Sequence, residues 1–364
     1  MITAKSLTSS LLKAFAFAIG IVIFFWFMYT VISVVLLFLL AVVFAVIINA
    51  PVTWLEKKKV PRAWAAVIVI LLIYIVIGLL SWLIFPMVSI QLKSLIANLP
   101  VYAEKIEKMF SAWKAEYFHW MNQSVQENKI TSHLPDITNT LWKLGGYSIS
   151  LLESLVLFLV LASLTAYMVI YPRPLLEFYL SLFPLRLRDK SERAFVKTSS
   201  MLIGWMRANL IGGVIQGISV VVFLSLMNVP GAWVWGALAF ISQMIPKVGF
   251  YLMSIPPTLV ALSISPLTAL WVFIFFIAMD EILGDFVMPK IRSSSMNLHP
   301  VAIIFVLLTM GSAFGFTGIL LSTPVAAFLK AYYEEFYLSV LNSDDKMEQR
   351  IDSMIQRSNP KKVA

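Results

Sequence analysis

The sequence predicts an all-α integral membrane protein with about six full transmembrane helices, two re-entrant or broken helical hairpins and an external helical insert. Three observations support this prediction. Apolar residues make up 60% of the 364-residue chain and charged residues only 13%, which is outside the range usual for soluble domains. The apolar residues form runs of roughly 20 residues, the length of one bilayer crossing. Lys and Arg gather between some of these runs and not others, as expected for loops on one side of a membrane.

The composition also excludes several classes of function. The chain has no cysteine, so it has no disulfide framework, thiolate nucleophile or cysteine metal site, and we expect no cofactor and no metal. The net charge of +9 does not indicate nucleic-acid binding, because the basic residues lie between apolar runs and topology explains them.

The first region, residues 1–86, is predicted to contain membrane helices 1–3. The apolar run from Ala14 to Ala50 would be roughly 55 Å long as one helix, nearly twice the hydrocarbon thickness, so we expect a hairpin that turns near Tyr29–Ser33. The loop at 51–62 is rich in Lys and Arg and is expected to be cytoplasmic. The N-terminus is then also cytoplasmic, and the first span is expected to stay uncleaved.

The third span, 65–86, leads to an external amphipathic helical region at 87–146. There Tyr102, Ile106 and Trp113 recur at helical spacing, which is typical of one apolar helix face. Membrane helix 4 follows at 147–171. Residues 172–207 carry an excess of Arg and are predicted to form cytoplasmic amphipathic helices along the inner membrane surface.

The region 208–337 contains two broken helix pairs. After a fifth span, the segments within 233–264 are each short for a crossing and are separated by Pro246-Lys247-Val248-Gly249. The segment 300–337 is interrupted by glycines and by Pro324. Short, Pro- and Gly-broken pairs of this kind are typical of re-entrant hairpins that line a cavity. The tail at 338–364 is expected in the cytoplasm.

Three stretches carry a resemblance to a known family. They are Ile245-Pro246-Lys247-Val248-Gly249, Pro289-Lys290-Ile291 leading to Leu298-His299-Pro300, and Gly311 through Phe314-Gly315 and Gly318 to Pro324. In this order they resemble the autoinducer-2 exporter family of bacterial membrane proteins, over nearly the whole chain. The resemblance implies seven or eight membrane segments in the bacterial inner membrane and efflux of small solutes, with quorum-signal export attributed to some members and sodium-proton antiport to others. The chain departs from the family pattern at Lys247, Asn209 and Met288.

We expect the solute path to be lined by backbone and polar groups of this region, which the resemblance identifies as a transport core. Glycines permit close approach and prolines free backbone carbonyls, although helix packing alone would also explain them. Lys247 would attract an anionic or polyhydroxylated solute, or pair with acids. Asn209 and Gln216 share one face of a helix and would either line the path or join helices. The predicted path residues are Asn209, Gln216, Pro246, Lys247, Gly249, Gly311, Gly315, Gly318 and Pro324.

A second set of residues is predicted to couple an ion. Asp280, Glu281 and Asp285 end the span before Pro289, and like charges in partial burial favour proton uptake. The alternative is an interfacial acid group that pairs with Lys290 or Arg292. His299 would shuttle protons near neutral pH, or start a helix.

The resulting hypothesis is a secondary transporter that exports a small polar solute, with proton or cation coupling. The alternatives are a sodium-proton antiporter, a passive channel and, with no supporting motif, an intramembrane enzyme. No G-x-x-x-x-G-K-[ST] or H-E-x-x-H motif is present, so neither an ATP-driven pump nor a zinc enzyme is indicated. The expected partners are the lipid bilayer, a small-molecule or ion substrate and further copies of the chain in a homo-oligomer.

Overall fold

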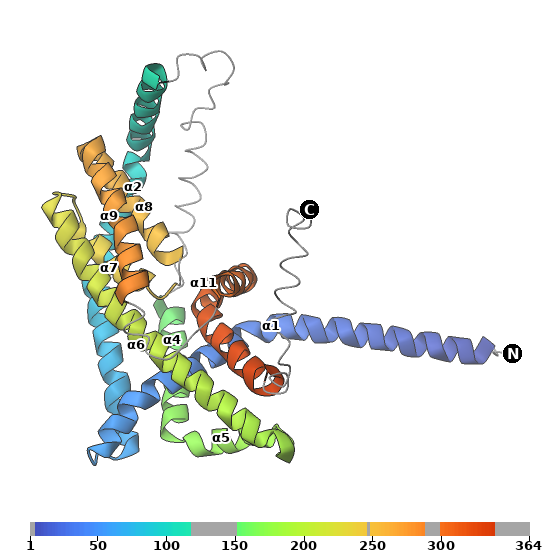
Figure 1. Cartoon of the computed structure of the whole chain (residues 1–364). Coiled ribbons are helices and arrows are strands. Elements are labelled where there is room, and N and C mark those ends of the chain that lie inside the picture. The colour runs from blue at the N-terminus through green and yellow to red at the C-terminus, as the bar shows by residue number, and fades with distance from the viewer. Residues whose placement is uncertain (1–3, 118–150, 246–247, 288–298, 339–364) are drawn as a thin grey trace, which may run out of the picture.

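The computed structural model describes residues 4–117, 151–245, 248–287 and 299–338, and all regular elements in these ranges are helices (Figure 1). Five helical stretches in this part of the chain are long and apolar enough to cross a membrane, and a bent helix pair could make a sixth. The protein is therefore an all-α membrane protein, as predicted. The five stretches are Phe15–Lys57, Arg62–Leu79, Leu185–Leu226, Pro266–Gly284 and Pro300–Leu338.

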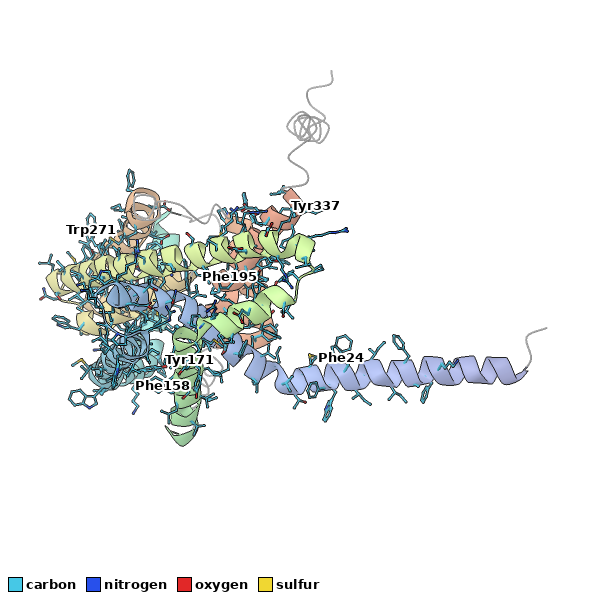
Figure 2. The ribbon with its side chains drawn as sticks, turned by 90° about the horizontal axis from the view of Figure 1, so that it is seen from below. Phe24, Phe158, Tyr171, Phe195, Trp271 and Tyr337 are labelled. Atoms are coloured by element: carbon cyan, nitrogen blue, oxygen red, sulfur yellow. The ribbon has the colours of Figure 1, made fainter. Side chains whose placement is uncertain are left out.

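Helix α1, Ala4–Lys57, is continuous over 54 residues, so the predicted turn near Tyr29–Ser33 was wrong. That stretch contains neither Gly nor Pro, so nothing in it breaks the helical hydrogen bonds. The turn was predicted from apolar length alone. The first half of α1 projects from the body with its side chains exposed, as at Phe24 (Figure 2), and such an apolar surface requires lipid or protein to cover it.

Helix α2, Arg62–Tyr117, spans 56 residues and continues through Pro86 and Pro100. Its start packs with the second half of α1 and with α4, Leu151–Ile170, around small residues such as Ala41 and Ala65. Its far half carries Tyr102, which is buried against the later helices, with Ile106 packed beside it. Residues 87–117, the start of the predicted external region, are thus a continuation of α2. Residues 118–146 lie outside the described part of the chain.

Arg62 joins the three helices of this first group. Its Nε donates to the carbonyl oxygen of Val169 at 2.8 Å, and its Nη atoms donate to Glu56 at 3.0 Å and Asn49 at 2.5 Å. One guanidinium thus satisfies acceptors on α1, on α4 and near the turn between α1 and α2. This is the fork geometry that distinguishes Arg from Lys.

After α4 the chain bends by 83° into α5, Pro172–Ser181. A short 3₁₀ turn at Leu185–Leu187 leads into α6, Arg188–Leu226, a single helix of 39 residues. Helix α6 contacts α1, α5, α7 and α11 and runs diagonally across the molecule (Figure 1).

The first broken pair is present as α7, Ala232–Ser242, and α8, Val248–Ile264. Helix α9, Pro266–Glu281, packs on α8 and ends in a π-helical turn at Ile282–Val287. These elements and α6 share a core that includes Trp235 and Phe276.

The second broken pair lies within α11, Pro300–Tyr333, which is followed by a π-helical turn at Glu334–Leu338. The helical path breaks at Gly315, where φ is 59° and ψ is −141°. Only glycine adopts such a conformation without strain. Pro324, which was predicted to interrupt this region, lies inside a continuous helix instead.

Helices α6 and α7 cross at glycines. A Cβ added at Gly217 would lie 2.9 Å from the carbonyl oxygen of Gly236, and one added at Gly236 would lie 2.7 Å from that of Gly217. Glycines on both sides allow the two backbones to meet, as in small-residue packing between membrane helices.

We expect Gly217→Ala to lower the unfolding stability of the detergent-solubilised protein by about 1–3 kcal/mol, because the added methyl group overpacks the crossing. Gly78→Ala is the matched control, since a Cβ there meets nothing within 4 Å. Thermal unfolding of both variants measures the difference. Equal midpoints would contradict the close crossing.

Candidate functional site: a polar junction on helix α6

Asn209 and Gln216 lie on one face of α6 and are almost fully buried, at 2% and 0% exposure. Gln216 accepts a hydrogen bond through Oε1 from Nε2 of Gln243, which directly follows α7. The predicted pair of polar residues is therefore on the packed side of α6, and one of its members joins α6 to the first broken pair.

Three side chains in this part of the molecule hold a buried polar atom without a hydrogen-bond partner in the structure. They are Nδ2 of Asn209, Nε2 of Gln216 and Oγ1 of Thr323, and Thr323 is 3% exposed. An unpaired buried polar group costs about 1–3 kcal/mol. We call Asn209, Gln216, Gln243 and Thr323 the polar junction.

The antiparallel register of α6 and α11 places Thr323 opposite the α6 segment just before Asn209. Arg193 and Lys197 pair with Glu335 and Glu334, and Met201 packs with Ala327. Continuing this register by one to two turns brings the segment around Thr323 opposite the α6 segment that ends at Asn209. The second half of α11 and the end of α7 thus meet successive stretches of α6 along its length.

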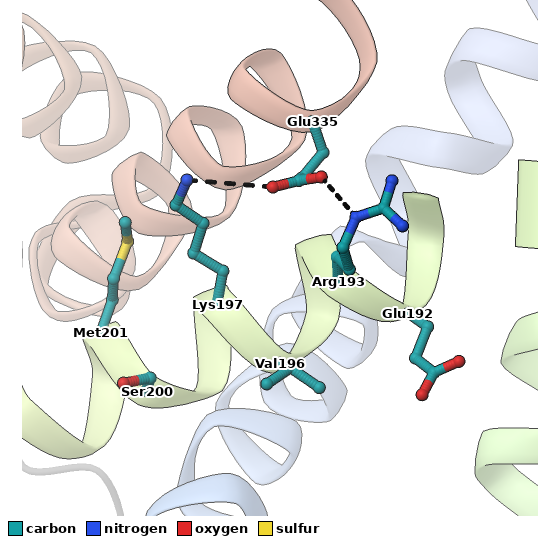
Figure 3. Close-up of a pocket in the computed structure, with 7 residues that line it drawn as sticks. All are labelled: Glu192, Arg193, Val196, Lys197, Ser200, Met201 and Glu335. Atoms are coloured by element: carbon teal, nitrogen blue, oxygen red, sulfur yellow. Dashed lines mark hydrogen bonds and ion pairs between the residues drawn. The ribbon is translucent and has the colours of Figure 1, made fainter. Parts of the chain in front are cut away.

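Charged side chains fix this register where the start of α6 meets the end of α11, around a groove of about 370 Å³ (Figure 3). Nε of Arg193 lies 3.0 Å from Oε2 of Glu335, and Nζ of Lys197 lies 2.6 Å from Oε2 of Glu334. Tyr179 on α5 adds a hydrogen bond to Tyr332 on α11. Because these charges neutralise one another, we interpret the groove as a helix contact. Its lining residues are Glu192, Arg193, Val196, Lys197, Ser200, Met201 and Glu335.

The predicted path glycines stand at the two breaks. Gly249 is buried, and a Cβ there would collide with the carbonyl oxygen of Ser242. Gly318 packs equally tightly on the carbonyl oxygen of Met310, and Gly311 lies against Ile319, because α11 folds back at Gly315. These contacts support the helix-packing interpretation of the glycines.

The structure describes one of the two prolines of the predicted path. Pro324 is buried in α11, and because proline has no N–H, it cannot donate to the carbonyl of Leu320 one turn earlier. An acceptor is thereby added next to the junction. Pro246 and Lys247 lie outside the described residues, so their role stays a prediction.

The predicted coupling residues are not part of the polar junction as described. Asp280 is half-buried and Glu281 is exposed at the end of α9. Asp285 falls in the π-helical turn, so it does not share a face with Glu281 in the simple i, i+4 way of an α-helix. The side chain of Asp285 and residues Lys290 and Arg292 lie outside the described part.

His299 caps α11. Its Nδ1 accepts a hydrogen bond from the N–H of Val301 at 3.3 Å, and the residue is exposed. This is the helix-start role that the sequence offered as the alternative to proton shuttling.

Three features of the site were missed from the sequence. Gln243 and Thr323 have no distinguishing local pattern, and only the packing reveals them. The crossing of α6 and α7 did have a signal, because Gly213 and Gly217 form a G-x-x-x-G pattern that is typical of close membrane-helix packing.

Comparisons with known proteins identify a transporter family and relatives named as transport proteins. The family model described as "AI-2E family transporter" matches residues 15–338. The chain is similar to the putative transport protein YueF of Bacillus subtilis, with 26% identity over 78% of this chain and 79% of that protein. It is also similar to the AI-2 transport protein TqsA of Escherichia coli, with 24% identity over 83% of this chain and 86% of that protein.

Removing an unpaired hydroxyl from the junction should stabilise the fold. We expect Thr323→Val to raise the unfolding free energy by about 1–3 kcal/mol. Thr165→Val should act in the same way, because its Oγ1 on α4 is also buried and unpaired.

Thr198→Val is the control on α6, since its hydroxyl donates to the carbonyl oxygen of Ala194 at 2.8 Å and its removal should bring no gain. Denaturation in detergent compares the three variants. A loss of stability in Thr323→Val would mean that its hydroxyl has a partner.

Proposed function

The chain belongs to the AI-2E family of transporters and is a membrane transporter, and we propose that it exports a small polar solute by a secondary, gradient-driven mechanism. The observation that carries this proposal is the polar junction. Its unpaired amide groups lie on the one helix against which both broken pairs pack. Broken helices that meet at buried polar groups are the arrangement in which many secondary transporters bind their substrates.

The chemistry of the junction favours an uncharged solute rich in hydroxyl or carbonyl groups. The unpaired Nδ2 and Nε2 atoms are hydrogen-bond donors and require acceptor oxygens. No charged residue is among the fully buried residues of the described chain, so this part of the core provides no counter-ion for an ionic solute. The name of the relative TqsA, an AI-2 transport protein, supports a quorum-signal-like molecule as one such solute.

The setting of the transporter is also proposed. We propose a location in the bacterial inner membrane with both termini in the cytoplasm. The basic turn between α1 and α2 supports a cytoplasmic position for that turn. It does not support the N-terminal half of this orientation, because α1 is continuous and lacks the hairpin from which a cytoplasmic N-terminus was predicted. We further propose a homo-oligomer, which the exposed apolar first half of α1 supports because this surface has to be covered.

A flux assay tests the proposal. Proteoliposomes containing the protein should take up a small polyhydroxylated solute from a metabolite panel with saturation and in response to an imposed pH gradient. Thr323→Val should reduce this flux at least about tenfold, the effect of losing roughly 1.4 kcal/mol of solute interaction, while Thr165→Val leaves it unchanged. Flux that neither saturates nor responds to the gradient would identify a passive channel instead.

Coupling is tested separately with the acid group. Glu281→Gln combined with Asp285→Asn should abolish the pH dependence of transport, because neither side chain can then take up a proton. Glu177→Gln, on the surface of α5, is the control. Size-exclusion profiles verify that the variants fold. Unchanged pH dependence in the double variant would exclude these acids as the coupling site.

A further inference from the structure

Helix α5 presents three different faces. Arg173, Glu177 and Ser181 recur every four residues on one face, where Arg173 and Glu177 form an exposed ion pair at 3.3 Å. Tyr179 and Phe183 lie on the second face and pack on α6 and on the end of α11. Tyr179 donates to the carbonyl oxygen of Ser191 at 2.9 Å, and its ring packs at an angle of 43° on that of Phe195. Phe183 packs near Phe336.

The third face is apolar and exposed. Leu175, Phe178 and Leu182 follow at spacings of three and four residues, with exposures of 42%, 65% and 63%. Leu185 in the following turn is 77% exposed. A helix that already buries an aromatic face against the protein would not keep a second apolar stripe open to water, because each exposed side chain of this size forgoes about 1.5–3 kcal/mol of burial.

The surroundings of the stripe indicate what covers it. The apolar helix α4 bends by 83° into α5, so if α4 crosses the bilayer, α5 lies near the membrane plane. Figure 1 shows α5 at the same end of the molecule as the turn between α1 and α2. That turn carries exposed Lys57, Lys58 and Lys59, and Trp54 and Trp64 flank it with exposures of 55% and 65%. Exposed tryptophans beside lysines are typical of the depth of lipid headgroups.

Basic side chains also border the stripe itself. Arg173 precedes it and Arg186 lies at its far end, and both are exposed. This combination of an apolar stripe with cationic edges matches a bilayer surface that contains anionic lipids. A protein partner would not require the positive charge that both surface segments share at this end.

We propose that α5 and the turn after it form an in-plane membrane anchor. Leu175, Phe178, Leu182 and Leu185 enter the acyl-chain boundary, and Arg173 and Arg186 bind the headgroups of anionic lipids. The second face of α5 packs on the start of α6 and the end of α11, so the anchor sets the position of these helices at the membrane surface.

Site-directed fluorescence tests the anchor. The chain has no cysteine, so Phe178→Cys and Ser181→Cys each provide a unique site for an environment-sensitive label on the full-length protein. In vesicles of phosphatidylcholine with phosphatidylglycerol, we expect the label at 178 to show blue-shifted emission and quenching by spin-labelled lipid. The label at 181, on the polar face, should behave as in water.

The fluorescence results show whether lipid, protein or water lies against the apolar stripe of α5. Water-like emission at 178 would overturn the proposal. Blue-shifted emission at 178 without quenching by lipid would also overturn it, because a protein surface would then cover the stripe. A second experiment measures lipid preference in three variants. Arg173→Gln and Arg186→Gln each remove one basic side chain, and Glu177→Gln is the control. In each arginine variant, the preference for phosphatidylglycerol over phosphatidylcholine should fall roughly fivefold. Association of spin-labelled lipid measures this preference. Equal preference in all variants would exclude headgroup binding.

Discussion

The packing of both broken helix pairs on α6 is the constraint on which the rest of the structure depends. Helix α6 meets α11 in its first half and α7 in its second half. Glycines at positions 217 and 236 set the distance to α7, and ion pairs at Arg193 and Lys197 set the register with α11. The stretch of α6 between these two contacts joins the two pairs.

That intermediate surface is where the fold retains polar groups at a cost. Asn209, Gln216 and Thr323 are nine-tenths or more buried and hold unpaired atoms, although valine or leucine would fill such positions with less loss of free energy. Proteins that are optimised for stability alone would not keep several such groups in one region. Gln216 is also bonded to Gln243 beside the first helix break, which favours a binding role over a purely structural one.

Much of the fold could be predicted from apolar run length and from Pro and Gly. The break between α7 and α8, the break near Gly315 and the end of α4 all coincide with such residues. The prediction failed at Tyr29–Ser33, where run length suggested a turn but no residue there breaks a helix. Pro324 shows the reverse case, since the helix is continuous through a buried proline. Of the site, Asn209 and Gln216 were predictable as polar residues in an apolar run, whereas Gln243 and Thr323 depend on which helices pack together.

The uncharged junction also limits how an ion gradient could act on the solute. No fully buried residue in the described chain is charged, so a coupling ion has no acidic partner among those residues. The acids at the end of α9 are one alternative, and the π-helical turn that contains Asp285 contacts α6. Glu107 on α2 is another, since its Oε1 is buried and has no hydrogen-bond partner. In the proposed mechanism, a change of charge at the α9 acids would act on the polar junction through the contact of this turn with α6. Coupling of this kind would depend on helix position, because the acids and the polar junction have a helix contact in common and no shared side chain.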